Sequence, residues 1–122
     1  MIAYDRNNIF ARILRGEAPC RKVYEDEFAL AFDNIHPRTP IHVLVVPKGE
    51  YVSHADFSTQ APPELVAGFW RAVARTAEKL GLLERGYRLI TNHGADANQI
   101  VFHFHVHILG GERLPGVSAS SD

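Results

Sequence analysis

Three of the seven histidines in this 122-residue chain stand at alternate positions of one short segment, as His103, His105 and His107. Apolar residues occupy the positions between them, and such alternation is typical of a β-strand with one polar and one apolar face. The pattern therefore predicts a strand over about 101–109. We expect it to carry the three imidazoles on one face and to pack its other face against helices.

An imidazole face of this kind fits two kinds of chemistry. Neutral histidine is a common zinc ligand, but same-face neighbours in a strand lie about 6.6 Å apart, so three reach one ion only if the strand bends strongly. Alternatively, the middle imidazole attacks phosphorus as a nucleophile while its neighbours donate hydrogen bonds to phosphate oxygens. A solvated face without function is a third interpretation, but three imidazoles repel one another when protonated, and Thr, Ser or Gln would avoid that cost.

The composition excludes several functional classes. Thirteen basic residues face fourteen acidic ones, for a net charge of -1, so nothing attracts the chain generally to nucleic acid or to anionic membranes. The single cysteine, Cys20, excludes an internal disulfide and any zinc motif built on cysteines. No apolar run approaches the ~20 residues of a membrane span, and residues 1–8 are too polar for a signal peptide. We therefore expect a cytoplasmic protein.

The remaining sequence predicts the elements that hold the histidine segment. Asn7 or Asn8 can cap a helix over 9–15, and a proline pair can begin a longer helix over 62–80. The other strands are predicted over 22–25, 28–32, 41–46 and 87–91, with a polar loop at 92–98. Because the strands follow one another with short connections, we expect an α+β domain with an antiparallel sheet and its helices on one face. The domain should span 1–122, with a core at about 8–111 and frayed termini.

The histidine segment resembles the His-φ-His-φ-His-φ-φ signature of the histidine triad (HIT) superfamily, in which φ is apolar. Similar stretches at 8–10, 23–26, 31–32, 40–48, 86–88 and 109–111 resemble its Hint branch, the histidine triad nucleotide-binding proteins. This resemblance covers about 8–111. It implies a five-stranded antiparallel sheet with two helices, which pairs into a ten-stranded sheet in a homodimer. It also implies a hydrolase that cleaves the P–N bond of purine nucleoside 5′-phosphoramidates without a metal or other cofactor.

The same resemblance implies roles for individual residues. His105 would attack the α-phosphorus and form a nucleotidyl-histidine, while His103 and His107 would orient it and contact the phosphate, and Gln99 would assist catalysis. An apolar group would enclose the base, and Asn92 and Gln99 would lie near the phosphate. The residues expected to bind the nucleotide are Ile9, Phe10, Ile13, Phe32, Asp33, Asn34, Ile35, His42, Asn92, Asn98, Gln99, Ile100 and Val101.

Three positions depart from the pattern of this branch. Asn34 replaces the usual aspartate that accepts hydrogen bonds from the ribose hydroxyls, and a neutral amide accepts them more weakly; Asp33 is a possible substitute. Asn98 replaces a glycine, which would change the backbone near the phosphate. Ile100 replaces a serine that bonds to the leaving group, so protonation of the leaving amine would fall to His103, Gln99 or water. We therefore expect lower turnover or a changed preference for the leaving group.

Other functions remain open from the sequence. A dinucleoside polyphosphate hydrolase is one alternative, although the short N-terminal helix and Gly110-Gly111 favour the Hint branch. A nucleotide- or partner-binding module with weak catalysis is another, and a metal-binding protein is a third. His36, His54 and His93 have no assigned role and are expected at the surface. Phe69, Trp70 and Val73 are candidates for a dimer contact or for the core.

Overall fold

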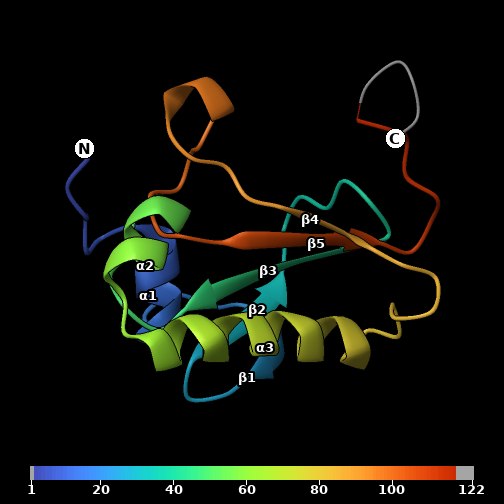
Figure 1. Ribbon diagram of the computed structural model, residues 1–122, viewed down its shortest axis with the longest axis horizontal. Coiled ribbons are helices and arrows are strands. Elements are labelled where there is room, and N and C mark those ends of the chain that lie inside the picture. The colour runs from blue at the N-terminus through green and yellow to red at the C-terminus, as the bar shows by residue number, and fades with distance from the viewer. Residues whose placement is uncertain (1, 118–122) are drawn as a thin grey trace.

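The fold is an α+β domain built on one five-stranded antiparallel sheet (Figure 1), as the sequence predicts. The computed structural model describes residues 2–117. The sheet order is β1-β2-β3-β5-β4, which leaves β1 and β4 at the edges. Of the termini predicted to fray, residues 1 and 118–122 lie outside the described residues, whereas Tyr4 and Arg6 form hydrogen bonds and an ion pair with the rest of the domain. The elements are α1 (Ile9–Leu14), β1 (Lys22–Glu25), β2 (Ala29–Asp33), β3 (Ile41–Pro47), α2 (His54–Gln60), α3 (Pro63–Lys79), β4 (Arg88–Ile90), the 3-10 helix η1 (Ala95–Ala97) and β5 (Val106–Gly110).

Local signals explain several of these boundaries. The Asn8 side chain accepts a hydrogen bond from the Ala11 N–H at 2.9 Å, which confirms it as the N-cap of α1. The Asp26 carboxylate accepts from the backbone N–H groups of Phe28 and Ala29 and closes the predicted hairpin between β1 and β2. Helix α2 was not predicted, although the sequence contains its signal. Ser53 and Asp56 form a reciprocal capping box at its N-terminus.

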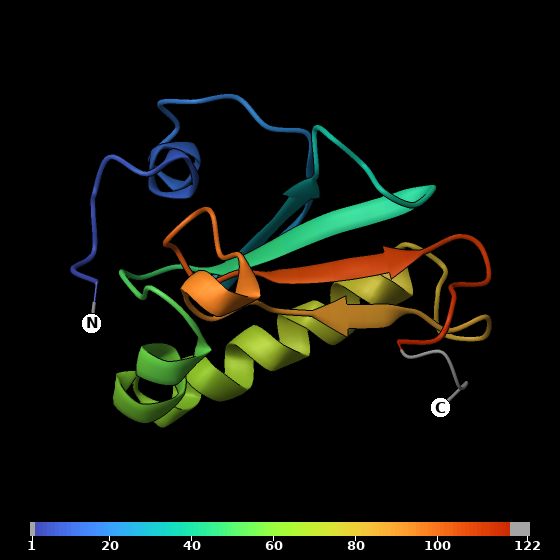
Figure 2. The ribbon, with the colours of Figure 1, turned by 90° about the horizontal axis from the view of Figure 1, so that it is seen from above.

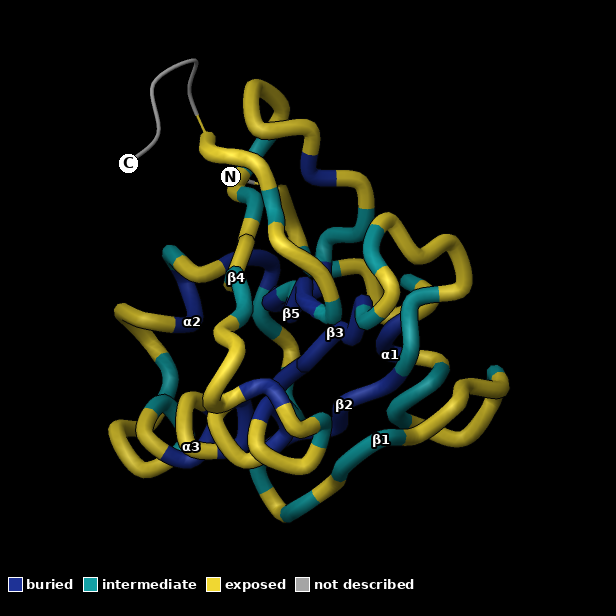
Figure 3. Tube along the Cα trace, turned by 90° about the vertical axis from the view of Figure 1, so that its right-hand side faces the viewer, coloured by how far each residue is buried: buried dark blue, intermediate teal, exposed yellow. Residues whose placement is uncertain are grey.

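The helices cover both faces of the sheet, so the prediction that they share one face was wrong. Figure 2 shows α1 on one side of the strands and α3 on the other. Residues 29–32 and 42–46 are buried at every position, whichever face they point to (Figure 3). A strand that is apolar on both faces needs cover on both, because a helix can shield only one side.

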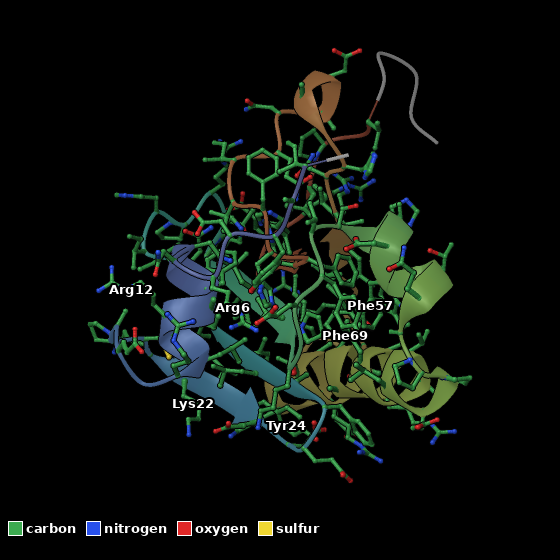
Figure 4. All side chains as sticks on the ribbon, turned by 90° about the vertical axis from the view of Figure 1, so that its left-hand side faces the viewer. Arg6, Arg12, Lys22, Tyr24, Phe57 and Phe69 are labelled. Carbon is green, nitrogen blue, oxygen red and sulfur yellow. The ribbon has the colours of Figure 1, made fainter. Side chains whose placement is uncertain are left out.

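The face beneath α2 and α3 carries the main core. Phe104, Val106 and Ile108 pack there with valines of β3, so the predicted apolar side of the histidine segment is confirmed. Phe57 of α2 and Phe69 of α3 point toward each other over this face (Figure 4), with ring centroids 5.2 Å apart. Phe69 and Val73 are therefore core residues, whereas Trp70 is 40% exposed.

The predicted strand over 101–109 is wrong in its first half, because β5 begins only at Val106. The pairing of Val45 with Val106 would place Pro47 opposite Phe104. The backbone groups of the even-numbered His42 in β3 and Lys48 just after it bond toward the β2 side, so the odd-numbered residues direct their backbone groups toward β5. Proline has no N–H, so the ladder cannot continue past Pro47. His103 and His105 therefore precede the strand, although they keep the side of His107.

No helix among residues 2–117 is long and apolar enough to cross a bilayer.

Candidate active site

The His105 ring is held by one of its two nitrogens. Its Nδ1 lies 2.7 Å from the carbonyl oxygen of His103, and a carbonyl can only accept, so Nδ1 carries the proton. In the neutral ring, Nε2 then has a free lone pair. Within residues 2–117, every fully buried side-chain nitrogen or oxygen has a hydrogen-bond partner. Nε2 of His105 has none among these residues, so it is not fully buried. Nε2 of His105 is therefore accessible as well as unprotonated, as a nucleophile requires.

His103 is fully buried, and both of its ring nitrogens have partners inside the protein. Nε2 donates to the carbonyl oxygen of Pro47 at 3.1 Å. Because β5 does not extend to Pro47, this carbonyl has no partner in that strand. Nδ1 lies 2.6 Å from the Tyr4 hydroxyl, which must donate because Nδ1 is the unprotonated nitrogen of this tautomer. The predicted contact of His103 with phosphate therefore has no free polar atom to make it.

A second chain of hydrogen bonds determines the tautomer of His107. The backbone N–H of Arg38 donates to Nδ1 of His42 at 3.1 Å, so neutral His42 carries its proton on Nε2. That Nε2 lies 2.8 Å from Nδ1 of His107 and donates to it. The amide nitrogen of Asn34 lies 3.3 Å from the same Nε2, but both atoms are donors, so the shorter contact is the hydrogen bond. His107 is left with Nε2–H as a free donor.

Burial keeps these rings neutral. Desolvation lowers the pKa of His103 to about 4, with the neighbouring His105 adding to the effect. It also lowers the pKa of His107 to about 4, with further contributions from His105, His42 and Arg38. The pKa values of His105 and His42 are lowered for the same first reason. At neutral pH the cluster therefore holds uncharged imidazoles, and among the described residues the Nε2 lone pair of His105 and the Nε2–H of His107 have no hydrogen-bond partner.

The ring of Phe10 forms the apolar wall of the cluster. Its centroid lies 5.0 Å from that of His105 and 5.5 Å from that of Phe32, in both cases edge to face. Ile13 and Val101 pack partly buried around this group. The predicted apolar residues therefore meet beside His105 in part, through Phe10, Phe32, Ile13 and Val101.

Other predicted binding residues lie further into solvent. Ile9 is 44% exposed, Ile35 86% and Ile100 76%. Asp33 and Asn92 are half-buried, and Asn98 is exposed. Asn98 adopts the left-handed backbone conformation with φ of 59°, which asparagine tolerates better than most residues. Asn98 stands where the pattern of the Hint branch has glycine, and glycine also adopts this backbone conformation readily.

Gln99 acts as a brace within the loop before the triad. Its amide oxygen accepts from the Gly94 N–H at 2.9 Å, and its amide nitrogen donates to the carbonyls of Val52 and Val101. A second link joins the Ser53 hydroxyl to Nδ1 of His93 at 2.6 Å. The polar atoms of the Gln99 side chain are thus engaged with backbone, so its predicted catalytic role lacks a free donor.

Sequence reasoning missed two contributors to the cluster. Tyr4 lies in the segment before α1, and the Arg38 backbone lies in the connection before β3; no local pattern pointed to either. His36, His54 and His93 are exposed as predicted. Within residues 2–117, no group of three or more His, Cys, Asp or Glu side chains is arranged to hold a metal ion.

One further hollow lies away from the histidines. It has a volume of about 340 Å³ and is lined by arginines, among them Arg85, Arg88 and Arg113, together with Leu109 and Gly110. Because His105 precedes the first residue of β5 and Gly110 is its last, the hollow is at the opposite end of that strand. It contributes nothing to the histidine cluster.

Known proteins share both the sequence and this fold. The HIT domain family matches residues 15–114. A 13.2 kDa HIT-like protein of Azospirillum brasilense is 55% identical over 111 residues, which cover 91% of each chain. A HIT family hydrolase from Clostridium thermocellum superposes with a TM-score of 0.85 at 37% identity, over 93% of this chain and 99% of that one. A histidine triad nucleotide-binding protein from Candida albicans superposes with a TM-score of 0.74 at 25% identity, over 93% and 87%.

Proposed function

Since this chain belongs to the HIT domain family, we propose that it is a nucleotide-binding hydrolase of the Hint type. Its substrates are purine nucleoside 5′-phosphoramidates, whose P–N bond it cleaves through a nucleotidyl-His105 intermediate. The observation that carries the proposal is the tautomer of His105. The bond from Nδ1 to the His103 carbonyl leaves Nε2 unprotonated and accessible. The similarity to the solved HIT family hydrolase and to the solved histidine triad nucleotide-binding protein also supports this function.

The reaction proceeds in two displacements at phosphorus. The lone pair of His105 Nε2 forms a bond to the α-phosphorus, and the P–N bond breaks with its electron pair leaving on the amine, which takes up a proton. Water then attacks the same phosphorus and releases a proton to solvent, and the P–Nε2 bond breaks with its electron pair returning to the nitrogen, which leaves neutral His105 and a nucleoside monophosphate. While the phosphorus is attached, the ring is cationic, and the His103 carbonyl stabilises it through the Nδ1–H bond.

His107 and solvent complete the proposed chemistry. The Nε2–H of His107, oriented by the Arg38–His42–His107 chain, donates to a phosphate oxygen during both displacements. The proton for the leaving amine comes from water, because the ring nitrogens of His103 and the amide of Gln99 are already engaged. Slow turnover with poor leaving groups is the expected consequence.

A burst assay tests the proposal directly. The protein is mixed with an adenosine 5′-phosphoramidate that carries a fluorescent amine, beside His105→Ala and the exposed control His36→Ala. We expect a burst of amine stoichiometric with the wild-type and control proteins and none with His105→Ala, and acid-quenched protein should carry a nucleotidyl adduct. Equal and negligible release by all three proteins contradicts the enzyme. Nucleotide binding without release would then favour a binding module, and faster release from a dinucleoside polyphosphate would favour that alternative substrate.

A homodimer is part of the proposal. β4 is a short edge strand, and Leu89 and Ile90 on it are 42% and 36% exposed. Such an edge can pair with the same edge of a second copy and extend the sheet to ten strands. Light scattering during gel filtration should give twice the mass of 13.6 kDa, and Leu89→Lys should reduce it. A wild-type monomer at micromolar concentration contradicts the dimer.

A cytoplasmic location also stays a prediction.

A further inference from the structure

We propose that Tyr4 is a positioning residue for the nucleophile, acting on His105 through the buried imidazole of His103. The inference rests on the proposed role of His105. Tyr4 lies 99 positions before His103 in the sequence, yet its hydroxyl approaches the ring nitrogen Nδ1 to 2.6 Å. The two aromatic rings also meet edge to face, with centroids 5.6 Å apart.

Each hydrogen bond at the His103 ring has a defined direction. The Pro47 carbonyl can only accept a hydrogen bond, so Nε2 of His103 is the protonated nitrogen and donates to it. Nδ1 of a neutral ring then holds a lone pair, and the Tyr4 hydroxyl is the group that donates to it. Burial raises the pKa of Tyr4, which keeps this hydroxyl protonated. Together the two bonds determine both the tautomer and the orientation of the ring.

The backbone of His103 connects this ring to His105. His103 presents its own backbone carbonyl to Nδ1 of His105 at 2.7 Å. Residues 103–105 lie outside the strand ladder, so neighbouring loops and side chains hold this stretch in place. The Phe104 N–H bonds to the Tyr51 carbonyl, and the Thr91 hydroxyl bonds to the His105 carbonyl. The His103 side chain, held between Tyr4 and Pro47, is a further anchor of the carbonyl that sets the His105 tautomer.

Contacts of the segment before α1 hold Tyr4 beside His103. Arg6, which Figure 4 labels beside α1, forms an ion pair with Glu50 at 2.8 Å, just after β3. Arg15 donates to the Arg6 carbonyl, and the Asp5 carbonyl accepts from Asn8. These contacts lay the segment before α1 across the end of β3, where it covers His103. The segment therefore does more than lead into the first helix, because it carries the donor that completes the buried ring.

Tyr4→Phe tests the proposal, since it removes only the hydroxyl. Tyr24→Phe is the matched control, because Tyr24 donates to Asp26 in the β1–β2 hairpin, away from the histidines. The first readout is two-bond ¹H–¹⁵N NMR of the imidazoles. We expect the Nε2–H tautomer for His103 and the Nδ1–H tautomer for His105 in the wild-type protein and in Tyr24→Phe. In Tyr4→Phe the Nδ1 resonance of His103 should move toward that of a free lone pair, and His105 should show mixed tautomers.

The second readout is the steady-state turnover of the fluorescent phosphoramidate. Tyr4→Phe should lower kcat about tenfold, since the net contribution of a single hydrogen bond corresponds to about one tenfold step in rate. KM should change less than twofold, and Tyr24→Phe should change neither. An Nδ1–H tautomer of His103 in the wild-type protein overturns the proposal, and this measurement holds even if Tyr4→Phe fails to fold. An unchanged His105 tautomer and rate in folded Tyr4→Phe also overturn it. Absence of turnover in every protein would instead refute the proposed function and leave the NMR result standing.

Discussion

The buried neutral imidazole of His103 makes the folded protein sensitive to acid in a calculable way. Its ring is 0% exposed, and burial lowers its pKa from the ordinary 6.5 to about 4. In the unfolded chain the ring takes up a proton below about pH 6.5, whereas in the folded state it stays neutral until about pH 4. The unfolded state therefore binds more protons in this interval, so the free energy of unfolding falls as the pH falls.

The size of the effect follows from the same two values. A tenfold change in proton affinity is worth about 1.4 kcal/mol, so the interval corresponds to about 3 kcal/mol of stability. That contribution is fully present above pH 6.5 and is lost on the way to pH 4. His107, whose pKa is lowered to about 4 as well, acts in the same direction. A typical small domain has only about 5–15 kcal/mol of stability, so the loss should be readily measured.

Urea unfolding at half-unit steps from pH 7.5 to 4 measures this dependence. His103→Gln keeps an amide N–H that can reach the Pro47 carbonyl but cannot titrate, so we expect its stability to fall by about 3 kcal/mol less than that of the wild-type protein. Exposed His36 is the control, because its ring is in solvent in both states. His36→Gln should follow the wild-type curve. Parallel curves for His103→Gln and the wild-type protein would refute the argument that burial holds this ring neutral.

Three further changes test the core and the site. Phe104→Ala should lower the free energy of unfolding by about 3–5 kcal/mol, since the ring is 1% exposed among the phenylalanines of α2 and α3; a loss below about 1 kcal/mol in urea unfolding would contradict that placement. His42→Ala removes the donor to His107 and should lower the single-turnover rate of amine release at least about tenfold, with an unchanged rate counting against the hydrogen-bond chain. Ile100→Ser introduces the hydroxyl that the family resemblance implies at the leaving group and should raise kcat on an adenosine phosphoramidate, whereas no increase would show that this exposed side chain does not limit turnover.

Much of the fold could be predicted from local sequence signals. The capping asparagine, the hairpin turn and the alternation of residues 103–108 each depend on residues close together in the chain, and these features were found where they were expected. The missed helix α2 is short, and its capping box lies in a polar stretch without an extended apolar period. The placement of helices on both faces required knowing that β2 and β3 are buried on both sides, which depends on strand order.

The site was predictable in its residue types and less so in its individual roles. The family resemblance gave His42 only as one of the residues expected to bind the nucleotide, and the structure adds its 2.8 Å contact with His107. Gln99 was expected in catalysis, yet its amide braces the loop through three backbone groups. A side chain that fits a role by residue type can have its polar atoms taken by backbone groups, and those partners are visible only in three dimensions.

By itself the sequence determined which chemistry is available, since three imidazoles at alternate positions must lie on one side of an extended segment. Only the tertiary structure decided which nitrogen of each ring carries a proton. For His103 and His107 the partners that decide it stand 99, 65 and 56 positions away along the chain, in the pairs Tyr4–His103, His42–His107 and Pro47–His103, whereas Nδ1 of His105 bonds to the carbonyl two positions before it. A tautomer depends on the donors and acceptors around a ring, and folding brings these together from distant segments. The sequence therefore identifies the three histidines, and the fold distinguishes the nucleophile from the buried anchor and the donor.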